Sequence, residues 1–113
     1  MSNVSRGAYF KARTRKWLSG RGYQVAEMEI IRWVFRPGST RIPIKRDQFG
    51  SDLIAMSDTE IIFVQVKGGE SARTGNFPEA QRAFNEFKFP VFTKRWIVAW
   101  PPRSREPRIV VVP

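Results

Sequence analysis

The sequence contains no cysteine and no histidine. The first absence excludes disulfide bonds, thiolate nucleophiles and every zinc site that needs a cysteine ligand. The second excludes Ser-His-Asp chemistry, imidazole general bases and imidazole metal ligands. Any catalysis by this chain must therefore depend on carboxylates, lysine, tyrosine, serine or a metal ion held by oxygen atoms.

Acidic residues are also scarce: 10 Asp and Glu stand against 20 Lys and Arg in 113 residues, a formal net charge of +10. Because 42% of the residues are hydrophobic, we expect one folded domain over residues 1–113 rather than a disordered basic tail. A basic folded surface favours a polyanionic partner, most commonly nucleic acid. No apolar run could span a membrane and residues 1–9 lack the apolar core of a signal peptide, so we expect a cytoplasmic protein, encoded by a bacterium, an archaeon or a phage, that makes no membrane contact.

The few acids gather in the middle of the chain. Residues 1–21 hold six bases and no acid, whereas residues 47–79 hold six acids and two bases. Carboxylates would repel the phosphates that a basic surface attracts. Either these acids are solvated loop residues, or a divalent cation lies between them and a phosphate.

Hydrophobic patterning predicts an α/β fold. A helix is predicted over 5–19, and a second helix begins at Pro78, with Asn76 as its N-cap and Glu79 completing a capping box. Segments rich in β-branched and aromatic residues predict five strands, over 23–35, 51–56, 60–67, 96–100 and 108–112. The turn 36–39 ends the first of them. We therefore expect a single domain with a central mixed sheet of about five strands, flanked by two main helices.

One group of polar residues stands out within the predicted hairpin of strands 51–56 and 60–67. Asp52 opens the first strand, and Gln65 and Lys67 lie on one face of the second because strand side chains alternate. If Asp52 lies beside them, the group offers a carboxylate and an amide oxygen to Mg²⁺ and an ammonium to offset charge, which suits phosphodiester hydrolysis. Each residue also has a purely structural interpretation. Asp52 would be a turn residue that opens the strand, Gln65 would make a buried hydrogen bond, and Lys67 would be a cation at the strand end.

The pattern Asp52-x(12)-Gln65-x-Lys67, in this strand context, resembles the PD-(D/E)xK nuclease superfamily and in particular the Holliday junction resolvases of archaeal and phage type. The resemblance covers essentially the whole chain. It implies a restriction-endonuclease-like fold, Mg²⁺ as cofactor with Mn²⁺ as the alternative, a homodimer, and branched DNA as partner. It also implies that Asp52 and Gln65 bind the metal and that Lys67 is catalytic.

Two features of the chain depart from that pattern. Gln65 stands where the family usually has Glu, and residues 5–19 contain no acid where many resolvases place a Glu. Glu27 and Glu29 lie on the same face of the predicted strand, so alternation does not choose between them as the missing carboxylate. Some related nucleases carry a Glu shortly after a Gly-Tyr turn and then an Asp-x-Phe-Gly segment. Comparison with them favours Glu29 and adds Asp47 as a further ligand.

The basic residues complete the hypothesis. Phosphate contacts are predicted for Arg6, Lys11, Arg13, Arg15, Lys16, Arg46 and Arg73. The function that we expect is a metal-dependent, structure-selective endodeoxyribonuclease that resolves four-way junctions in DNA recombination and repair. The alternatives are another PD-(D/E)xK nuclease, acting on flaps or single strands or as a nicking enzyme, and a non-catalytic nucleic-acid-binding domain.

Overall fold

A computed structural model describes residues 3–35, 37–38 and 41–113 of the chain. For residues 3–5, 32 and 45 it describes the backbone alone. Within these ranges, the elements follow one another as α1 (Asn3–Gly20), β1 (Gln24–Glu27), β2 (Glu29–Val34), β3 (Ile42–Asp47), β4 (Leu53–Met56), β5 (Ile61–Gly68), the 3-10 turn η1 (Glu70–Ala72), α2 (Pro78–Asn85), β6 (Lys94–Trp100) and β7 (Arg108–Val111).

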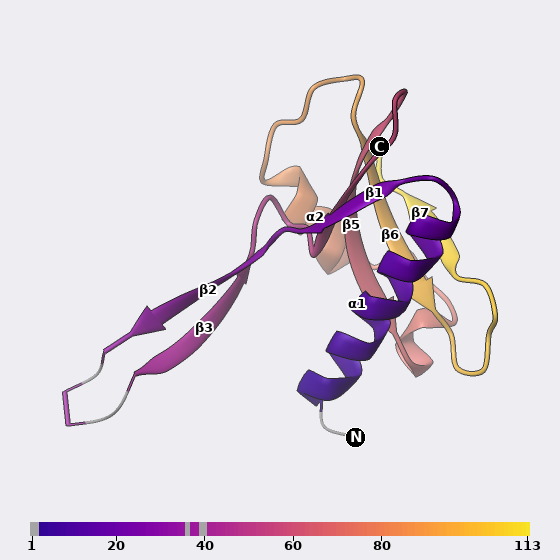
Figure 1. Ribbon diagram of the computed structural model, residues 1–113. Coiled ribbons are helices and arrows are strands. Elements are labelled where there is room, and N and C mark those ends of the chain that lie inside the picture. The colour runs from indigo at the N-terminus through magenta and orange to yellow at the C-terminus, as the bar shows by residue number, and fades with distance from the viewer. Residues whose placement is uncertain (1–2, 36, 39–40) are drawn as a thin grey trace.

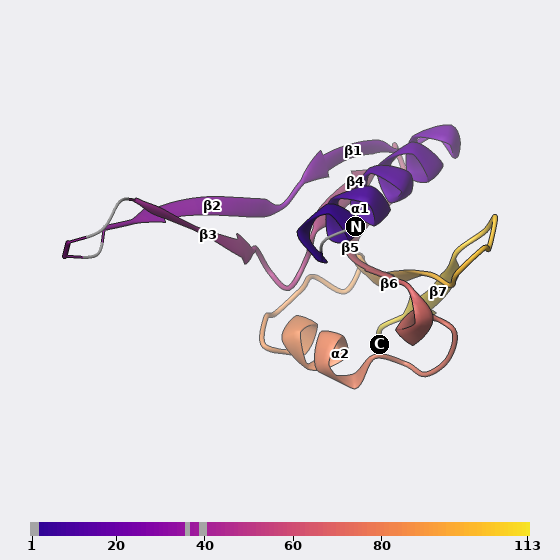
Figure 2. The same cartoon turned by 90° about the horizontal axis from the view of Figure 1, so that it is seen from below.

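The central sheet has the strand order β1-β4-β5-β6-β7 across the described residues, with β5 and β6 parallel and the other pairs antiparallel. Helix α1 covers one face of this sheet and α2 the other (Figures 1 and 2). The predicted α/β domain with a mixed five-stranded sheet and two main helices is confirmed.

Two apolar clusters fill the space between the sheet and its helices. On the α1 side, Leu18 packs against Val64 and Trp100. On the α2 side, Phe84 packs against Ile97 and Val112. Because side chains alternate along a strand, β5 sends Val64 into the first layer and leaves Gln65 and Lys67 on the opposite face.

The predicted strand 23–35 is wrong as one element, because the chain changes partner at Met28. The Met28 N–H donates to the Asp52 carbonyl at 2.9 Å, and the Met28 carbonyl accepts from the Gln48 N–H at 3.1 Å. Before this residue the chain pairs with β4, and after it with β3, a strand that the sequence analysis missed. The β2–β3 ribbon is a separate two-stranded sheet that projects from the domain (Figure 1). Beyond it, Pro37 and Gly38 form the predicted turn, while 36 and 39 lie outside the described residues.

The predicted cap of α2 is also wrong. Pro78 opens the helix as expected, but the N-cap is Phe77, in the left-handed region with φ 53°, and no side-chain cap bond is found for it among the described residues. The Asn76 backbone carbonyl instead accepts a hydrogen bond from the Gln81 amide at 2.7 Å. Tertiary packing of the helix at Ala80 and Phe84, both buried, replaces the local capping contact.

Candidate active site

Three carboxylates meet where the β2–β3 ribbon leaves the central sheet. Glu29 opens β2 and lies opposite Asp47, the last residue of β3, and Asp52 directly precedes β4. One oxygen from each of these side chains lies within 4.8 Å of the others. The change of partner at Met28 is what brings the first residue of the ribbon to the start of β4.

Like Glu29, Asp52 is half-buried. Its Oδ2 accepts a hydrogen bond from the Val66 N–H at 2.8 Å, which ties the carboxyl to β5. Burial raises the pKa of Asp52 to about 7, against the lowering effect of that hydrogen bond, and the nearby Asp47 and Glu29 raise it further. A bound cation would relieve this repulsion and hold Asp52 in its charged form.

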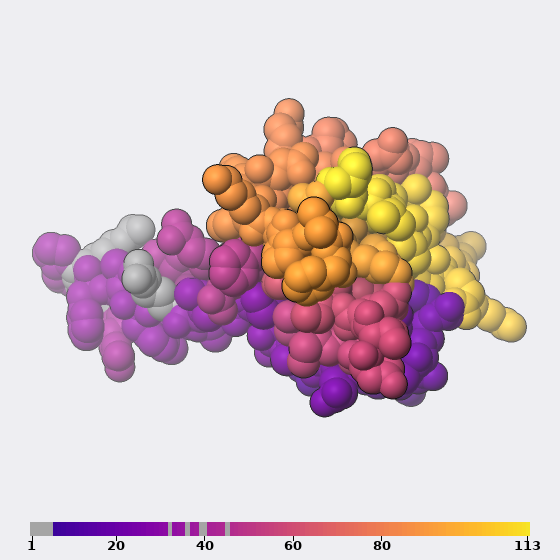
Figure 3. Space-filling model, turned by 90° about the horizontal axis from the view of Figure 1, so that it is seen from above, coloured from indigo at the N-terminus to yellow at the C-terminus, as the bar shows by residue number. Residues whose placement is uncertain are grey.

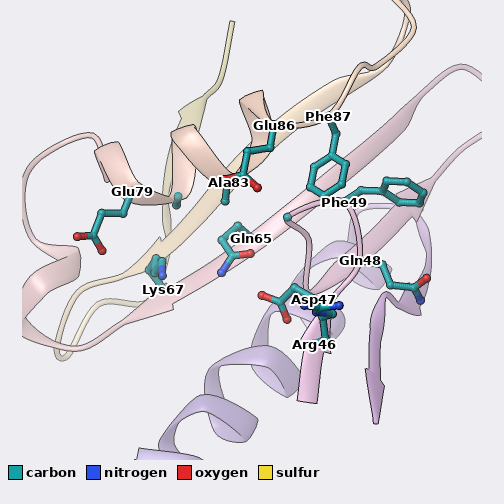
Figure 4. Close-up of a pocket in the computed structure, with 12 residues that line it drawn as sticks. Arg46, Asp47, Gln48, Phe49, Gln65, Lys67, Glu79, Ala83, Glu86 and Phe87 are labelled. Carbon is teal, nitrogen blue, oxygen red and sulfur yellow. The ribbon is translucent and has the colours of Figure 1, made fainter. Parts of the chain in front are cut away.

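Gln65 and Lys67 extend the carboxylate cluster along β5. Both residues line a cavity of about 590 Å³ under α2 and also a neighbouring cavity of about 410 Å³ beside α1. Asp47 lines the first cavity, and Glu29 and Asp52 line the second, so the carboxylates lie where the two cavities meet. Figure 4 shows the Gln65 amide and the Asp47 carboxylate directed toward the same part of the first cavity.

The donor set fits a hard divalent cation. Gln65 Oε1 is buried and has no hydrogen-bond partner among the described residues. A buried amide oxygen that accepts no hydrogen bond costs folding free energy unless another ligand, such as a cation, binds it. Three carboxylates and one amide oxygen are the ligands that Mg²⁺ and Mn²⁺ prefer, and an ammonium at Lys67 would lie beside them.

The same arrangement of elements occurs in a solved protein. The structure of Archaeoglobus fulgidus Hjc, a Holliday junction resolvase from an archaeal hyperthermophile, superposes with a TM-score of 0.61 and 15% identity, covering 94% of this chain and 77% of that one. The chain shares the fold of that protein. The resemblance predicted from the Asp52, Gln65 and Lys67 pattern is thus confirmed at the level of the fold. No protein-family model and no curated protein sequence matches the chain.

Within this shared fold, the structure separates the two glutamates that alternation could not. Glu29 belongs to the carboxylate cluster, whereas Glu27 ends β1 with about half of its side chain exposed. Lys11 of α1 bridges them, with its Nζ 2.8 Å from Glu29 Oε2 and 3.1 Å from Glu27 Oε1. Burial lowers the pKa of Lys11, but the hydrogen bonds to Glu29 and Glu27 outweigh it and the net pKa is raised. Lys11 therefore stays charged beside the cluster.

The predicted phosphate-binding residues occupy different environments. Arg6 and Arg46 line the two cavities of the site, and Arg15 and Lys16 are exposed on α1. Lys11 is held by the two glutamates. The remaining two are engaged elsewhere: Arg13 lies 4.2 Å above the Trp100 ring and donates to the Ser104 carbonyl, and Arg73 pairs with Glu70.

Sequence reasoning missed the far wall of the larger cavity. Phe49, Glu86 and Phe87 line it (Figure 4). The loop before β4 closes tightly on α2 at Gly50, where a Cβ would lie 3.1 Å from the backbone of Ala83. The Phe-Gly pair at 49–50, both with positive φ, is the sequence signal for this turn, but its contact with α2 is not local.

No helix in the described part of the chain is long and apolar enough to cross a membrane.

Proposed function

We propose that the chain is a metal-dependent, structure-selective endodeoxyribonuclease that resolves four-way DNA junctions by phosphodiester hydrolysis. The observation that carries this proposal is the carboxylate cluster of Glu29, Asp47 and Asp52, at cavities that Gln65 also lines, together with a Gln65 Oε1 that is buried without a hydrogen-bond partner among the described residues. Two further observations support it: the chain shares its fold with a Holliday junction resolvase, and its net charge of +10 favours binding to DNA phosphates. Residues 1–113 then form one nuclease domain.

Four oxygen-bearing side chains would hold the metal, which we take to be Mg²⁺, with Mn²⁺ as a substitute: those of Asp52, Gln65, Glu29 and Asp47. A divalent cation there supplies Lewis-acid activation of the scissile phosphodiester. Asp52 acts as a ligand in its charged form, and its bond from the Val66 N–H fixes the orientation of the carboxyl. Lys67 offsets the negative charge that develops on the phosphate and orients the attacking water.

The substrate is held by its phosphates rather than read by its bases. Arg6 and Arg46 border the site and would contact the strand that is cut, and Arg15 and Lys16 would contact the arms of the junction. A homodimer would supply two such sites in fixed relation, as two cuts on opposed strands require. We place this activity in the cytoplasm, where branched DNA arises in recombination and repair.

The test is cleavage of a synthetic four-way junction by the wild type, Asp52→Asn and Asp58→Asn. Asp58 lies exposed in the turn between β4 and β5, so Asp58→Asn removes the same charge outside the site. We expect the wild type and Asp58→Asn to cut the junction with Mg²⁺ and not with EDTA, and Asp52→Asn to cut at least about 100-fold more slowly. Linear duplex and flap substrates report the selectivity. Equal rates for the two variants would refute the site, and equal cutting of every substrate would refute the assignment as a resolvase.

A further inference from the structure

The β2–β3 ribbon exposes large apolar side chains that the proposed chemistry does not use. We call the described part of this ribbon, residues 29–35 and 41–47, the arm. Ile31, Trp33 and Phe35 are 56%, 53% and 73% exposed. Figures 1 and 2 show the arm leading away from the sheet and both helices, and Figure 3 shows it as a narrow projection from the body of the molecule. A two-stranded ribbon of this kind buries little apolar surface and is at best marginally stable by itself. Large exposed apolar side chains on it therefore indicate a surface that binds a partner.

Two of the exposed apolar side chains, those of Ile31 and Trp33, lie on the same face of the arm as the carboxylates. Glu29 pairs with Asp47 and Trp33 with Pro43, and residues two or four apart on a strand share a face. Ile31 and Trp33 therefore continue the face that begins with Glu29. The Arg41 guanidinium lies 5.4 Å from the ring centroids of both Trp33 and Phe35, which places a cation between the two aromatic rings.

The charge of the arm indicates what kind of partner fits it. Between Glu29 and Asp47 at its base, the arm carries four bases and no acid over residues 30–35 and 41–46. A second copy of this chain would bring an equally basic arm against the first, with like charges opposed. A polyanion whose bases offer flat apolar faces matches both the charge and the rings.

We propose that the arm binds DNA by stacking Trp33 and Phe35 on bases left unpaired at the branch point, while Arg41 contacts a phosphate of the same strand. At a strand rise of roughly 3.3 Å per residue, Trp33 lies about 13 Å along the arm from Glu29. That separation is about four base-pair steps of DNA. The arm would then set how far from the branch the strand is cut. The inference rests on the proposed function in that its ligand is the proposed substrate.

The test measures binding without cleavage, in EDTA, using a labelled four-way junction and a linear duplex of the same length. The double variant Trp33→Ala/Phe35→Ala removes both rings and leaves every charge in place. Phe92→Ala is the control, because Phe92 is 72% exposed in the loop between α2 and β6. We expect the double variant to bind the junction about tenfold or more weakly with little change for the duplex, and Phe92→Ala to bind like the wild type.

A second measurement uses the unmodified protein, so that it does not depend on the folding of a variant. A junction carrying 5-iodouracil at the branch is irradiated with the wild type, and the cross-linked peptide is identified by mass spectrometry. We expect cross-links at Trp33 or Phe35. Cross-links confined to other segments, or wild-type junction affinity in the double variant, would overturn the inference. So would a double variant that sediments as a smaller oligomer than the wild type, because a second copy would then cover the arm.

The outcomes separate this inference from the nuclease proposal. A wild type that binds the junction through the arm and never cuts it with Mg²⁺ supports the inference and refutes the proposed function. A wild type that cuts junctions while the double variant binds and cuts them equally well supports the proposed function and refutes the inference.

Discussion

Glu29 and Asp47 lie opposite each other as the first pair of the β2–β3 ribbon, so each strand of the ribbon begins or ends with a carboxylate at the edge of the central sheet. Asp52, directly before β4, completes the cluster. The ribbon thus has two ends with different chemistry: acids at its base, and exposed aromatic residues with Arg41 toward its tip. A phosphate bound at the base would leave the neighbouring nucleotides beside the arm.

The two glutamates that bind Lys11 provide a matched pair of variants. Glu29→Gln removes a member of the carboxylate cluster, and Glu27→Gln removes the same charge from the other side of the same ammonium. We expect Glu29→Gln to cut the junction about 100-fold or more slowly at a fixed Mg²⁺ concentration, and Glu27→Gln to stay close to the wild type. Single-turnover cleavage rates check this. If both variants lose activity equally, the glutamates act through Lys11 and not through a metal.

Gln65→Glu should alter metal binding and stability in opposite directions. A fourth carboxylate beside Asp52 adds repulsion in the metal-free protein, so its melting temperature should fall below that of the wild type. The added charge should strengthen cation binding, so MgCl2 should raise the melting temperature more than in the wild type.

Differential scanning fluorimetry across a MgCl2 series measures both effects. Gln24→Glu is the control, because Gln24 is exposed at the start of β1. A Gln65→Glu variant that responds to MgCl2 no more than Gln24→Glu would show that Gln65 does not face a metal.

The packing of α1 on the sheet depends on one buried hydrogen bond. Thr14 is fully buried, and its Oγ1 accepts from the Trp100 indole N–H at 2.8 Å while donating to the Phe10 carbonyl. Thr14→Val keeps the shape but leaves the indole N–H unpaired, which should cost about 1–3 kcal/mol of unfolding free energy.

Thr14→Ser keeps the acceptor and removes one methyl group, at a cost of about 1 kcal/mol. Urea unfolding followed by tryptophan fluorescence measures both variants. A Thr14→Val protein as stable as the wild type would mean that this hydrogen bond contributes nothing to the packing of α1 on the sheet.

The sequence was sufficient to predict those parts of the fold that local patterning determines. The alternation along β5 is periodic, and it correctly placed Gln65 and Lys67 on one face. Pro78 at the start of α2 is likewise a local steric signal. The resemblance to archaeal resolvases rested on the Asp52, Gln65 and Lys67 pattern in its strand context, and the likeness to the Archaeoglobus fulgidus protein confirms it at the level of the fold.

Features set by contacts between distant segments were not predicted. Strand β3 contains only Ile42 and Ile44 in alternation around a proline, and residues 23–35 carry no break that marks the change of partner at Met28. That change depends on Asp52 and Gln48, which lie about twenty residues further along the chain. The choice between Glu27 and Glu29 depends on the same change, and therefore no rule of alternation could make it.

The most direct test of the central claim is the anomalous diffraction of a crystal of this protein grown or soaked with Mn²⁺. We expect an anomalous peak within coordination distance of the Glu29, Asp47 and Asp52 carboxylates and of Gln65 Oε1, at about 2.0–2.3 Å, and loss of that peak in Asp52→Asn. A wild-type crystal saturated with Mn²⁺ that shows no peak at these four side chains, or a peak that persists unchanged in Asp52→Asn, would contradict it.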